Sequence, residues 1–286
     1  MQKFWHYRSY FFIGFLALVT AAIWVAVFAA TPSGVLTVAV LDVGQGDSIY
    51  IESPTGQQLV IDGGPGSALL HALPDVMPIG DRSLDAIVET HPDADHISGF
   101  VELLARYSVE LFIKPGIEKD TATARALERG VADKKIPTYL ARRGMWLELG
   151  GGAELRILYP DRDVSHTTKT NDGGVVARLV YGKTTVLFMA DVSSAVESRL
   201  VLLDGSGLKS DILKVAHHGS KYSSASAFIS TVSPAAAVIS VGKNSYGHPT
   251  DQALSRLAAY SGEILRTDQA GTIVFVSDGK NFVRTR

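Results

Sequence analysis

The sequence contains no cysteine. Disulfide scaffolds, thiolate zinc sites, iron–sulfur clusters and cysteine nucleophiles are therefore excluded. A metal site in this chain has to be built from histidine and carboxylate ligands. The missing cysteine leaves the compartment open, because exported proteins need not carry disulfides.

An excess of basic charge is also missing. The 286 residues include 27 Lys and Arg against 29 Asp and Glu, which gives a net charge of −2. No global positive field therefore indicates a nucleic-acid partner. Hydrophobic residues make up 46% of the chain, which excludes intrinsic disorder and leaves room for one large domain or two small ones.

The N-terminal region carries no charged side chain over residues 9–37. Its apolar part, Tyr10–Ala30, spans 21 residues, enough for a helix to cross a hydrocarbon core of roughly 30 Å. Lys3 and Arg8 precede this stretch and predict a cytoplasmic N-terminus. We therefore expect residues 1–34 to form a flank, one transmembrane helix and a short linker. A single-pass anchor of this kind places the remainder of the chain outside the cytoplasm.

Two alternatives are open for this segment. A cleavable signal peptide would use the small residues near Val27–Ala30 and release a secreted protein, but the apolar run exceeds the roughly 7–15 residues typical of such signals. A buried globular helix is disfavoured, because the stretch is apolar on all sides and ends at the linker-like Thr31–Gly34. Without residues 1–34 the chain carries 25 basic and 29 acidic residues, a net charge of −4. This balance argues against tight duplex binding by charge alone.

Residues 35–286 are predicted to form one α/β domain. Strand-like runs come first, from Val35–Val43 to Gln58–Ile61, and alternating strands and helices follow from Leu84–Glu89 onward. The same order recurs after Gly150–Gly152. Continuous apolar strands of this kind need cover on both faces, which predicts two packed sheets with helices on their outer sides.

The segment His91–His96, with the sequence HPDADH, directly follows a predicted strand and opens a helix. It places four potential ligands within six residues: His91, Asp93, Asp95 and His96. A single acid or histidine in such a place is usually a helix cap or an ion-pair partner, but four together are difficult to explain by solvation. Imidazole and carboxylate ligands indicate Zn²⁺ or Mn²⁺.

Three later strand ends carry further ligand-type side chains. Asp191 follows an apolar strand, the pair His217 and His218 follows the next, and His248 lies in a loop after a third. Taken alone, Asp191 is as readily a helix N-cap, and a lone His248 is usually structural. Taken together, all of them lie on the carboxyl side of their strands, which predicts one shared cleft.

These residues resemble a known family. The HPDADH segment is similar to the His-x-His-x-Asp-His signature of the metallo-β-lactamase fold, and its Asp variant resembles the extracellular hydrolase domain of the ComEC competence proteins. The resemblance covers about residues 35–286. It continues in order through Leu41–Ser48, Ile61–Gly64, Asn171–Asp172, Met189–Asp191, Lys214–Ser220 and Gly247–Pro249.

The resemblance implies an α/β fold, a four-layer αβ/βα metallo-β-lactamase-like sandwich, with two divalent metal ions, Zn²⁺ or Mn²⁺, between the sheets. It implies that Asp95 orients the nucleophile, that Asp191 is catalytic, and that His217 completes the site or stabilises charge on the substrate. By position it assigns His91 and Asp93 to the first metal, Asp95 and His96 to the second, Asp191 to both, and His248 to the last ligand place.

The first metal site departs from the family pattern. Asp93 replaces a histidine, and Asn171 occupies the place of another. Both changes make the site harder, which predicts weaker and partial occupancy and shifts the preference towards Mn²⁺ without excluding Zn²⁺. Ala190 stands where the family usually has glycine, although Asp191 is retained.

The remaining candidates are less specific. Asp62, in a glycine-rich turn, is interpreted as structural, and Asp47 either faces the cleft or caps a turn. His218 either contacts the substrate or supports a ligand from behind. The loops after the histidine pair and before His248 offer groups for a phosphate, although exposed Lys and Tyr are more often merely solvated: Ser220, Lys221, Tyr222, Lys243, Asn244 and Tyr246.

Three functions remain as hypotheses. The first is a metal-dependent phosphodiesterase, a nuclease acting on DNA outside the cytoplasm in a ComEC-like role. The second is a hydrolase of a small or cell-envelope phosphoester or lactone, which the net charge of −4 favours. The third is a membrane-anchored binding module without catalysis. Because ComEC proteins carry a multi-spanning channel and this chain has one candidate span, a channel would be a separate partner protein, and the oligomeric state is left open.

Overall fold

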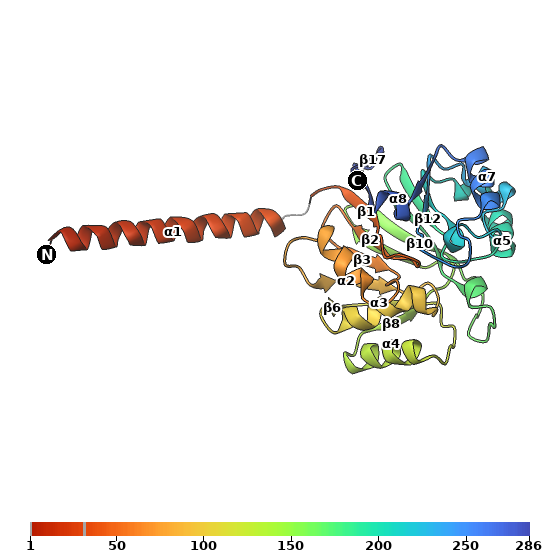
Figure 1. Cartoon of the computed structure of the whole chain (residues 1–286), viewed down its shortest axis with the longest axis horizontal. Coiled ribbons are helices and arrows are strands. Elements are labelled where there is room, and N and C mark those ends of the chain that lie inside the picture. Colours follow the sequence, from red (N-terminus) through yellow and green to blue (C-terminus); the bar gives the residue numbers. More distant parts are fainter. Residues whose placement is uncertain (1, 31–32) are drawn as a thin grey trace.

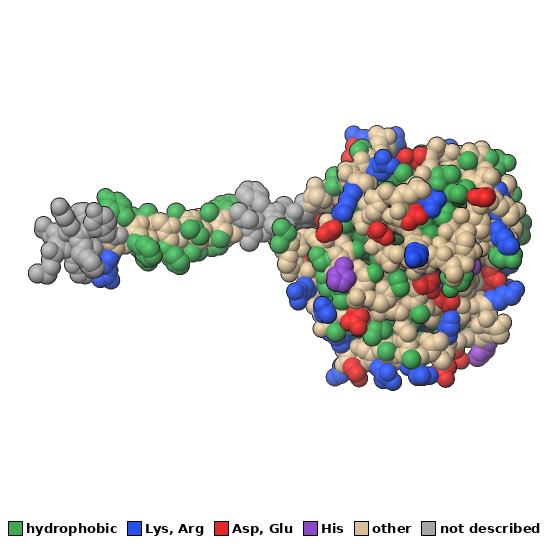
Figure 2. Space-filling view, in the orientation of Figure 1, with side chains coloured by type: hydrophobic (Ala, Val, Ile, Leu, Met, Phe, Trp, Pro, Cys, Tyr) green, Lys and Arg blue, Asp and Glu red, His purple; other side chains and the backbone are tan. Residues whose placement is uncertain are grey.

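The computed structural model describes residues 2–30 and 33–286, and within the first helix it describes the side chains of residue 8 and residues 10–24. Helix α1 (Gln2–Ala30) is a single rod ahead of the sheets (Figure 1). Its described apolar side chains are exposed, Phe11 at 79% and Leu18 at 71% (Figure 2). Among these described residues, no helix meets both the length and the apolarity that a membrane crossing needs. The expected span falls partly on residues 25–30, whose side chains lie outside the described set, so the transmembrane helix stays a prediction.

Two large sheets form the centre of the rest of the chain. The first has eight strands in the order β17 (Phe282–Arg284), β16 (Ile273–Ser277), β1 (Leu36–Val40), β2 (Ile49–Glu52), β3 (Gln58–Ile61), β5 (Ala86–Val88), β7 (Phe112–Lys114) and β8 (Thr138–Leu140). The second has seven, in the order β15 (Glu263–Arg266), β14 (Ala236–Ile239), β13 (Ile212–Lys214), β12 (Thr184–Phe188), β11 (Val176–Tyr181), β10 (Ala153–Tyr159) and β9 (Trp146–Gly150). A short pair joins β4 (Ser83–Leu84) to β6 (Ser108–Val109).

Each large sheet is antiparallel in one part and parallel in the other. Strands β3, β5, β7 and β8 run parallel in the first sheet, and β12, β13, β14 and β15 run parallel in the second. Parallel neighbours bring their carboxyl ends to one edge of the sheet, where the connecting loops can build a site. The predicted ligand segments all follow strands of these parallel parts.

Helices cover the outer face of each sheet and complete four layers. One apolar core lies between the sheets and contains Val38, Ile61, Leu155 and Phe188. A second lies between the first sheet and its helices, and a third between the second sheet and its helices. The helices are α2 (Ala68–Ala72), α3 (Ala94–Leu104) and α4 (Ala122–Asp133) on the first sheet, and α5 (Ser194–Asp204), α6 (Ser226–Val232), α7 (Asp251–Tyr260) and α8 (Thr267–Ala270) in the second half (Figure 1).

Helix α3 packs unusually closely on the turn that follows β3. A Cβ atom on Gly99 would lie 1.9 Å from the Gly63 carbonyl oxygen, and one on Gly63 would lie 2.6 Å from the Phe100 nitrogen. Both positions therefore require glycine. Gly63 N donates to His96 O at 2.5 Å and Gly99 N donates to Gly64 O at 3.0 Å, so the start of α3 is tied to the Asp62 turn.

The predicted α/β sandwich is confirmed, and its element order largely follows the expected one. Helix α4 begins one residue after Thr121, whose side chain accepts a hydrogen bond from Ala124 N at 3.2 Å as an N-cap should. The single run expected over Val35–Val43 is shorter, because the chain leaves the sheet after Val40 to enter the Gly44–Gly46 loop. Helix α2 and the edge strand β8, which is exposed throughout, carry too little hydrophobic periodicity to be predicted.

Glu197 makes the stability of the domain depend on pH. Its buried carboxylate accepts hydrogen bonds from Ser224 N at 2.6 Å and Ala225 N at 2.8 Å, which joins α5 to the start of α6. Burial raises the pKa of Glu197 to about 7, although the two backbone donors oppose the rise. Since the folded-state pKa lies above the unfolded one, the folded state binds more protons between about pH 4.5 and 7.

We therefore expect the wild-type free energy of unfolding to fall, relative to Glu197→Gln, as the pH rises through this window. Between pH 4.5 and pH 8 the wild type should lose about 3 kcal/mol more of its free energy of unfolding than Glu197→Gln, since one pKa unit corresponds to 1.36 kcal/mol. Urea denaturation of both proteins at pH 4.5, 6 and 8 measures it. Parallel pH profiles for the two proteins would contradict the assignment.

Candidate metal centre

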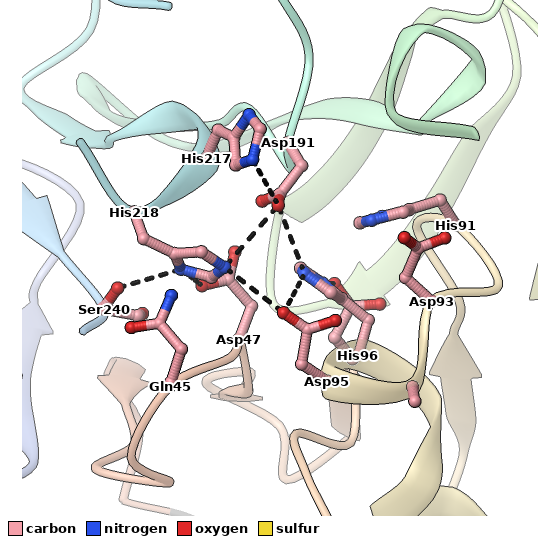
Figure 3. Close-up of polar contacts among 12 residues, drawn as sticks. Gln45, Asp47, His91, Asp93, Asp95, His96, Asp191, His217, His218 and Ser240 are labelled. Carbon is pink, nitrogen blue, oxygen red and sulfur yellow. Dashed lines mark hydrogen bonds and ion pairs between the residues drawn. The ribbon is translucent and has the colours of Figure 1, made fainter. Parts of the chain in front are cut away.

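Five side chains from both halves of the sandwich converge at the carboxyl ends of the parallel strands (Figure 3). They are His91 before α3, Asp95 and His96 in its first turn, Asp191 after β12, and His218 after β13. One group, His91, His96 and Asp191, offers ligand atoms within 4.8 Å of one another, and a second does the same with Asp95, His96 and His218. His96 belongs to both groups.

Three inner atoms of this cluster lack a hydrogen-bond partner among the described residues. They are Nε2 of His96, Nε2 of His218 and Oδ1 of Asp191, and all three are buried. Asp191 Oδ2 lies 3.5 Å from each of the two Nε2 atoms, and Asp95 Oδ2 lies 3.7 Å from that of His218. Buried polar atoms without partners are costly, so several aimed at one point fit a cation that the protein binds there. Neutral imidazole and carboxylate suit a divalent metal.

The opposite nitrogen of each imidazole is held from behind. His96 Nδ1 donates to Asp62 Oδ2 at 2.8 Å, and Asp62 itself accepts from Thr90 N at 2.8 Å and Thr90 Oγ1 at 2.6 Å. His91 Nδ1 donates to the same Thr90 hydroxyl at 3.0 Å. His218 Nδ1 donates to the Ser240 carbonyl at 2.9 Å. These bonds leave each Nε2 free to face the centre, as in metal sites whose outer hydrogen bonds orient the ligands.

The backbone is strained where the ligands are presented. Asp62, Ala190, His217 and His218 all adopt positive φ values, between 49° and 58°. Non-glycine residues in this region are uncommon and gather at functional sites. At Ala190 the left-handed φ explains why glycine suits that place, and it shows that alanine still directs Asp191 into the cluster.

Charges within the cluster shift the pKa values of its members in opposite directions. Burial lowers the pKa of His91 to about 4, so this imidazole is neutral at pH 7. Burial also opposes the charged form of His218, but Asp191, Asp47 and Asp95 outweigh it and raise the pKa to about 10. For Asp191, the charges of His218 and His96 overcome the effect of burial and hold the pKa well below its usual range. The carboxylates and the imidazoles of the cluster thus stabilise one another's charged forms.

Asp93 does not join the ligand groups found among the described residues. Its Oδ1 lies 2.7 Å from Lys119 Nζ, which forms an ion pair with it. Burial would raise the Asp93 pKa, but the charge of His91 and the hydrogen bond from Lys119 lower it. The amide oxygen of Asn171 accepts a hydrogen bond from Thr170 Oγ1 at 3.4 Å. The predicted metal roles of Asp93 and of the Asn171 position stay predictions.

The two histidines of the predicted pair lie in different places. His218 is buried in the cluster, whereas His217 is 30% exposed, with Nε2 3.8 Å from Asp191 Oδ2. His248 packs against His217, at 5.4 Å between ring centroids, and is not in a ligand group of the described residues. The structure thus places His218, expected to contact substrate, nearer the centre than His248, expected to bind metal. Two adjacent histidines in a sequence give no signal of which one turns inward.

The other predicted substrate residues divide into buried and exposed ones. Ser220 is buried, and its Oγ accepts from Tyr222 N at 3.3 Å within the same turn. Asn244 binds only backbone groups of its own loop, whereas Lys221 is exposed beside the Tyr222 ring. The described contacts of Asn244 therefore lie within its own loop, and that of Ser220 lies within its own turn.

Sequence reasoning missed Lys214. It is the last residue of β13, and its side chain is 1% exposed. Nζ donates to Asp47 Oδ2 at 2.7 Å and to Val215 O at 3.1 Å, and Asp47 Oδ1 lies 3.4 Å from His218 Nδ1. Burial opposes the ionised form of Asp47, but Lys214 and His218 lower its pKa. The available signal was a single lysine inside the apolar run Ile212–Val215.

The fold and this constellation define the class of the protein. Residues 41–243 match the family model of the metallo-beta-lactamase superfamily. Since the match covers most of the chain, the protein belongs to this superfamily and has the fold of its metal-dependent hydrolases. The membership predicted from the HPDADH segment is confirmed.

The more specific relatives are competence proteins. The chain is 31% identical to ComE operon protein 3 of Bacillus subtilis, over 82% of this chain and 32% of that protein. It is also 31% identical to competence protein ComA of Neisseria gonorrhoeae, over 86% and 33% respectively. The chain therefore spans about a third of the length of these relatives. Among solved structures, the metallo hydrolase Igni18 of Ignicoccus hospitalis shares the fold, with a TM-score of 0.56 at 15% identity over 84% of this chain and 98% of that one.

Lys214→Met should weaken metal binding by about 10-fold or more, because Asp47 then lacks its cation and no longer holds its place behind His218. Chelator competition with Zn²⁺ and Mn²⁺ measures the affinity. Lys114→Met is the matched control, since Lys114 ends the corresponding strand β7 and pairs with Glu128 at a partly exposed position. Unchanged affinity in Lys214→Met, or an equal loss in both variants, would show that the buried pair does not support the site.

Proposed function

We propose that the protein is a metal-dependent phosphodiesterase that cleaves DNA outside the cytoplasm. One observation carries the hydrolytic part of this proposal: the Nε2 atoms of His96 and His218 are buried without a hydrogen-bond partner among the described residues, and both lie 3.5 Å from Asp191 Oδ2. A binding module without catalysis has no need for such a costly arrangement. The similarity to competence proteins supports DNA as the substrate.

Divalent ions in such a site supply a water nucleophile at neutral pH and neutralise the negative charge that develops on a phosphate. We assign the ligands of the inner position to Asp95, His96, Asp191 and His218. This assignment replaces His248 by His218 in the predicted set, because His218 Nε2 is buried and unpartnered.

Two residues at the mouth of the centre act on the substrate in this proposal. The Asp95 side chain is 39% exposed while its Oδ2 faces His218, so it can orient an incoming water. His217 is partly exposed, with Nε2 3.8 Å from Asp191 Oδ2, and in this proposal its imidazole stabilises the charge that develops on the scissile group. Asp95, Asp191 and His217 therefore remain the proposed catalytic residues.

The outer metal position, with His91 and Asp93 as its ligands, is proposed to be weaker. Lys119 already neutralises Asp93, so a second dication has to displace this lysine or share the carboxylate with it. A carboxylate in place of an imidazole also favours Mn²⁺ over Zn²⁺. We therefore propose one firmly bound ion and one partly occupied position.

A hydrolase of a small phosphoester or lactone is the second candidate. The net charge of −4 over residues 35–286 favours it, because a polyanion gains little from such a domain by charge. Figure 2 shows acidic and basic side chains interspersed over the visible face. The choice between the two candidates depends on the substrate assay below.

The full chain, purified in detergent and loaded with Mn²⁺ or Zn²⁺, should hydrolyse bis-p-nitrophenyl phosphate and DNA oligonucleotides. Asp191→Ala should lower both rates by about 100-fold or more, because it removes the carboxylate between the two imidazoles. Asp75→Ala is the control, since Asp75 is exposed and pairs with Arg286 outside the cluster. Phosphodiester hydrolysis without DNA cleavage would favour the small-substrate enzyme, and turnover in Asp191→Ala would exclude this site.

We also propose that α1 anchors the protein, with the hydrolase domain outside the cytoplasm. The described apolar side chains of residues 10–24 are exposed, and Lys3 and Arg8 precede this apolar stretch in the sequence. Release by signal cleavage is the alternative for the same segment. A separate channel protein is the proposed partner if DNA is taken across the membrane.

The wild-type chain should stay with membranes in alkaline carbonate, and externally added protease should reach its hydrolase domain. The double variant Leu16→Arg and Ile23→Arg should be extracted, because charged side chains at the centre of a span each cost about 2.5–3.5 kcal/mol on the insertion scale. Thr20→Ser, an uncharged change in the same helix, is the control. A wild-type chain that is extracted intact would refute the anchor. A mature N-terminus near residue 31, found by N-terminal sequencing, would indicate signal cleavage.

A further inference from the structure

A row of rings leads from the metal centre to the surface of the second half. His217 Nε2 lies 3.8 Å from Asp191 Oδ2. The His217 ring is 5.4 Å from that of His248, and the His248 ring is 5.8 Å from that of Tyr246, at an interplanar angle of 31°. His217 and His248 are half-buried, and Tyr246 at the outer end of the row is 72% exposed. The exposed ring of Tyr246 is therefore separated from Asp191, a proposed metal ligand, by the rings of His217 and His248.

The loop that carries Tyr246 is held in one conformation by Asn244. The side-chain nitrogen of Asn244 donates to Gly242 O at 2.9 Å and to His248 O at 2.8 Å. Its side-chain oxygen accepts from Tyr246 N at 3.1 Å and from His248 N at 3.0 Å. With its amide fully used in this way, Asn244 organises the loop, so a ligand that stacks on Tyr246 orders little additional backbone.

A second loop, residues 219–222, lies beside the loop of Tyr246 and also carries a lysine and a tyrosine. Thr250 N donates to Gly219 O at 3.0 Å, and Gly219 approaches Pro249 so closely that a Cβ there would lie 2.5 Å from the Pro249 Cβ. The chain after Gly219 displays Lys221 and Tyr222, with Nζ 5.1 Å from the ring centroid, and Lys243 is exposed in the loop of Tyr246. Each loop therefore offers one lysine and one exposed tyrosine.

We propose that Tyr246, backed by His248, stacks on an unpaired nucleobase of a single-stranded nucleic acid at the metal centre, while Lys221 and Lys243 contact its phosphates. This inference rests on the proposed phosphodiesterase function and specifies its substrate. Stacking between a base and an aromatic side chain contributes about 1–3 kcal/mol and tolerates any sequence, since every base has a π face. The bases of a duplex are already stacked on one another and cannot use this surface.

Base stacking would also allow the domain to bind a polyanion despite its own net negative charge. With a net charge of −4, residues 35–286 cannot hold a polyanion by a general positive field. Base stacking requires no net charge on the protein, and two lysines suffice to follow the phosphates locally. The proposal therefore predicts weaker salt dependence than is usual for a basic nucleic-acid-binding domain.

Binding to the full chain in detergent tests this, with Ca²⁺ in place of Mn²⁺ or Zn²⁺ so that affinity is measured apart from cleavage. The probes are a fluorescein-labelled ten-residue oligothymidylate, an abasic backbone of equal length, and a DNA hairpin. Tyr246→Ala should weaken oligothymidylate binding by about 10-fold and leave the abasic probe unchanged, whereas Tyr246→Phe and Tyr246→Trp should bind like wild type. Tyr260→Ala is the control, since Tyr260 is 44% exposed but ends helix α7 away from the ring row.

Three outcomes would overturn the stacking role. In the first, the wild type binds oligothymidylate no better than the abasic or the hairpin probe. In the second, Tyr246→Ala loses equal affinity for both single-stranded probes, and in the third, Tyr246→Phe binds as weakly as Tyr246→Ala. Hydrolysis of bis-p-nitrophenyl phosphate by the wild type, measured on the same preparation, reports the proposed function separately. Hydrolysis with Tyr246-independent binding refutes the stacking role alone. Tyr246-dependent binding without hydrolysis refutes the phosphodiesterase alone.

Discussion

The architecture depends on one electrostatic constraint: two carboxylates are ionised close together in the interior. Asp47 and Asp191 are both nearly fully buried, and nearby positive charges lower the pKa of each. Like charges in a poorly polarisable interior repel strongly, so positive charge must be supplied from within the fold. The ion pair with Lys214 supplies part of it, and His96 and His218 supply more when protonated. In the proposed metal centre, the Nε2 atoms of these two imidazoles would bind the metal ion instead.

Much of the fold followed from local patterns. Short strands followed by alternating helices and strands indicated two sheets covered by helices. The four candidate ligand residues in His91–His96 indicated a metal centre at the end of β5. These inferences succeed because strand ends and helix starts are set by neighbouring residues. Parallel pairing then brings separate strand ends together without further information.

The inner details of the site could not be predicted in the same way. Which of His217 and His218 turns inward depends on left-handed backbone at both residues, a conformation that the histidine side chain does not predict. The partner of Asp93 is Lys119, which follows 26 residues later, beyond α3, β6 and β7. Lys214 contacts Asp47 from the other sheet, although the two residues are 167 positions apart in the sequence. Such pairs follow from packing between the two halves, which sequence periodicity does not encode.

The proposed ligands come from both halves of the sandwich, so a bound ion would also act as a non-local crosslink. It ties the segment after β5 to those after β12 and β13, and it is absent from the unfolded chain. Metal concentration thereby enters the folding equilibrium by mass action, with each tenfold excess over the dissociation constant adding about 1.4 kcal/mol. Where chelators deplete the ion, the halves are held by their apolar core and by the Lys214–Asp47 contact. Metal supply then governs how long the polypeptide survives proteases, as well as whether its centre is loaded.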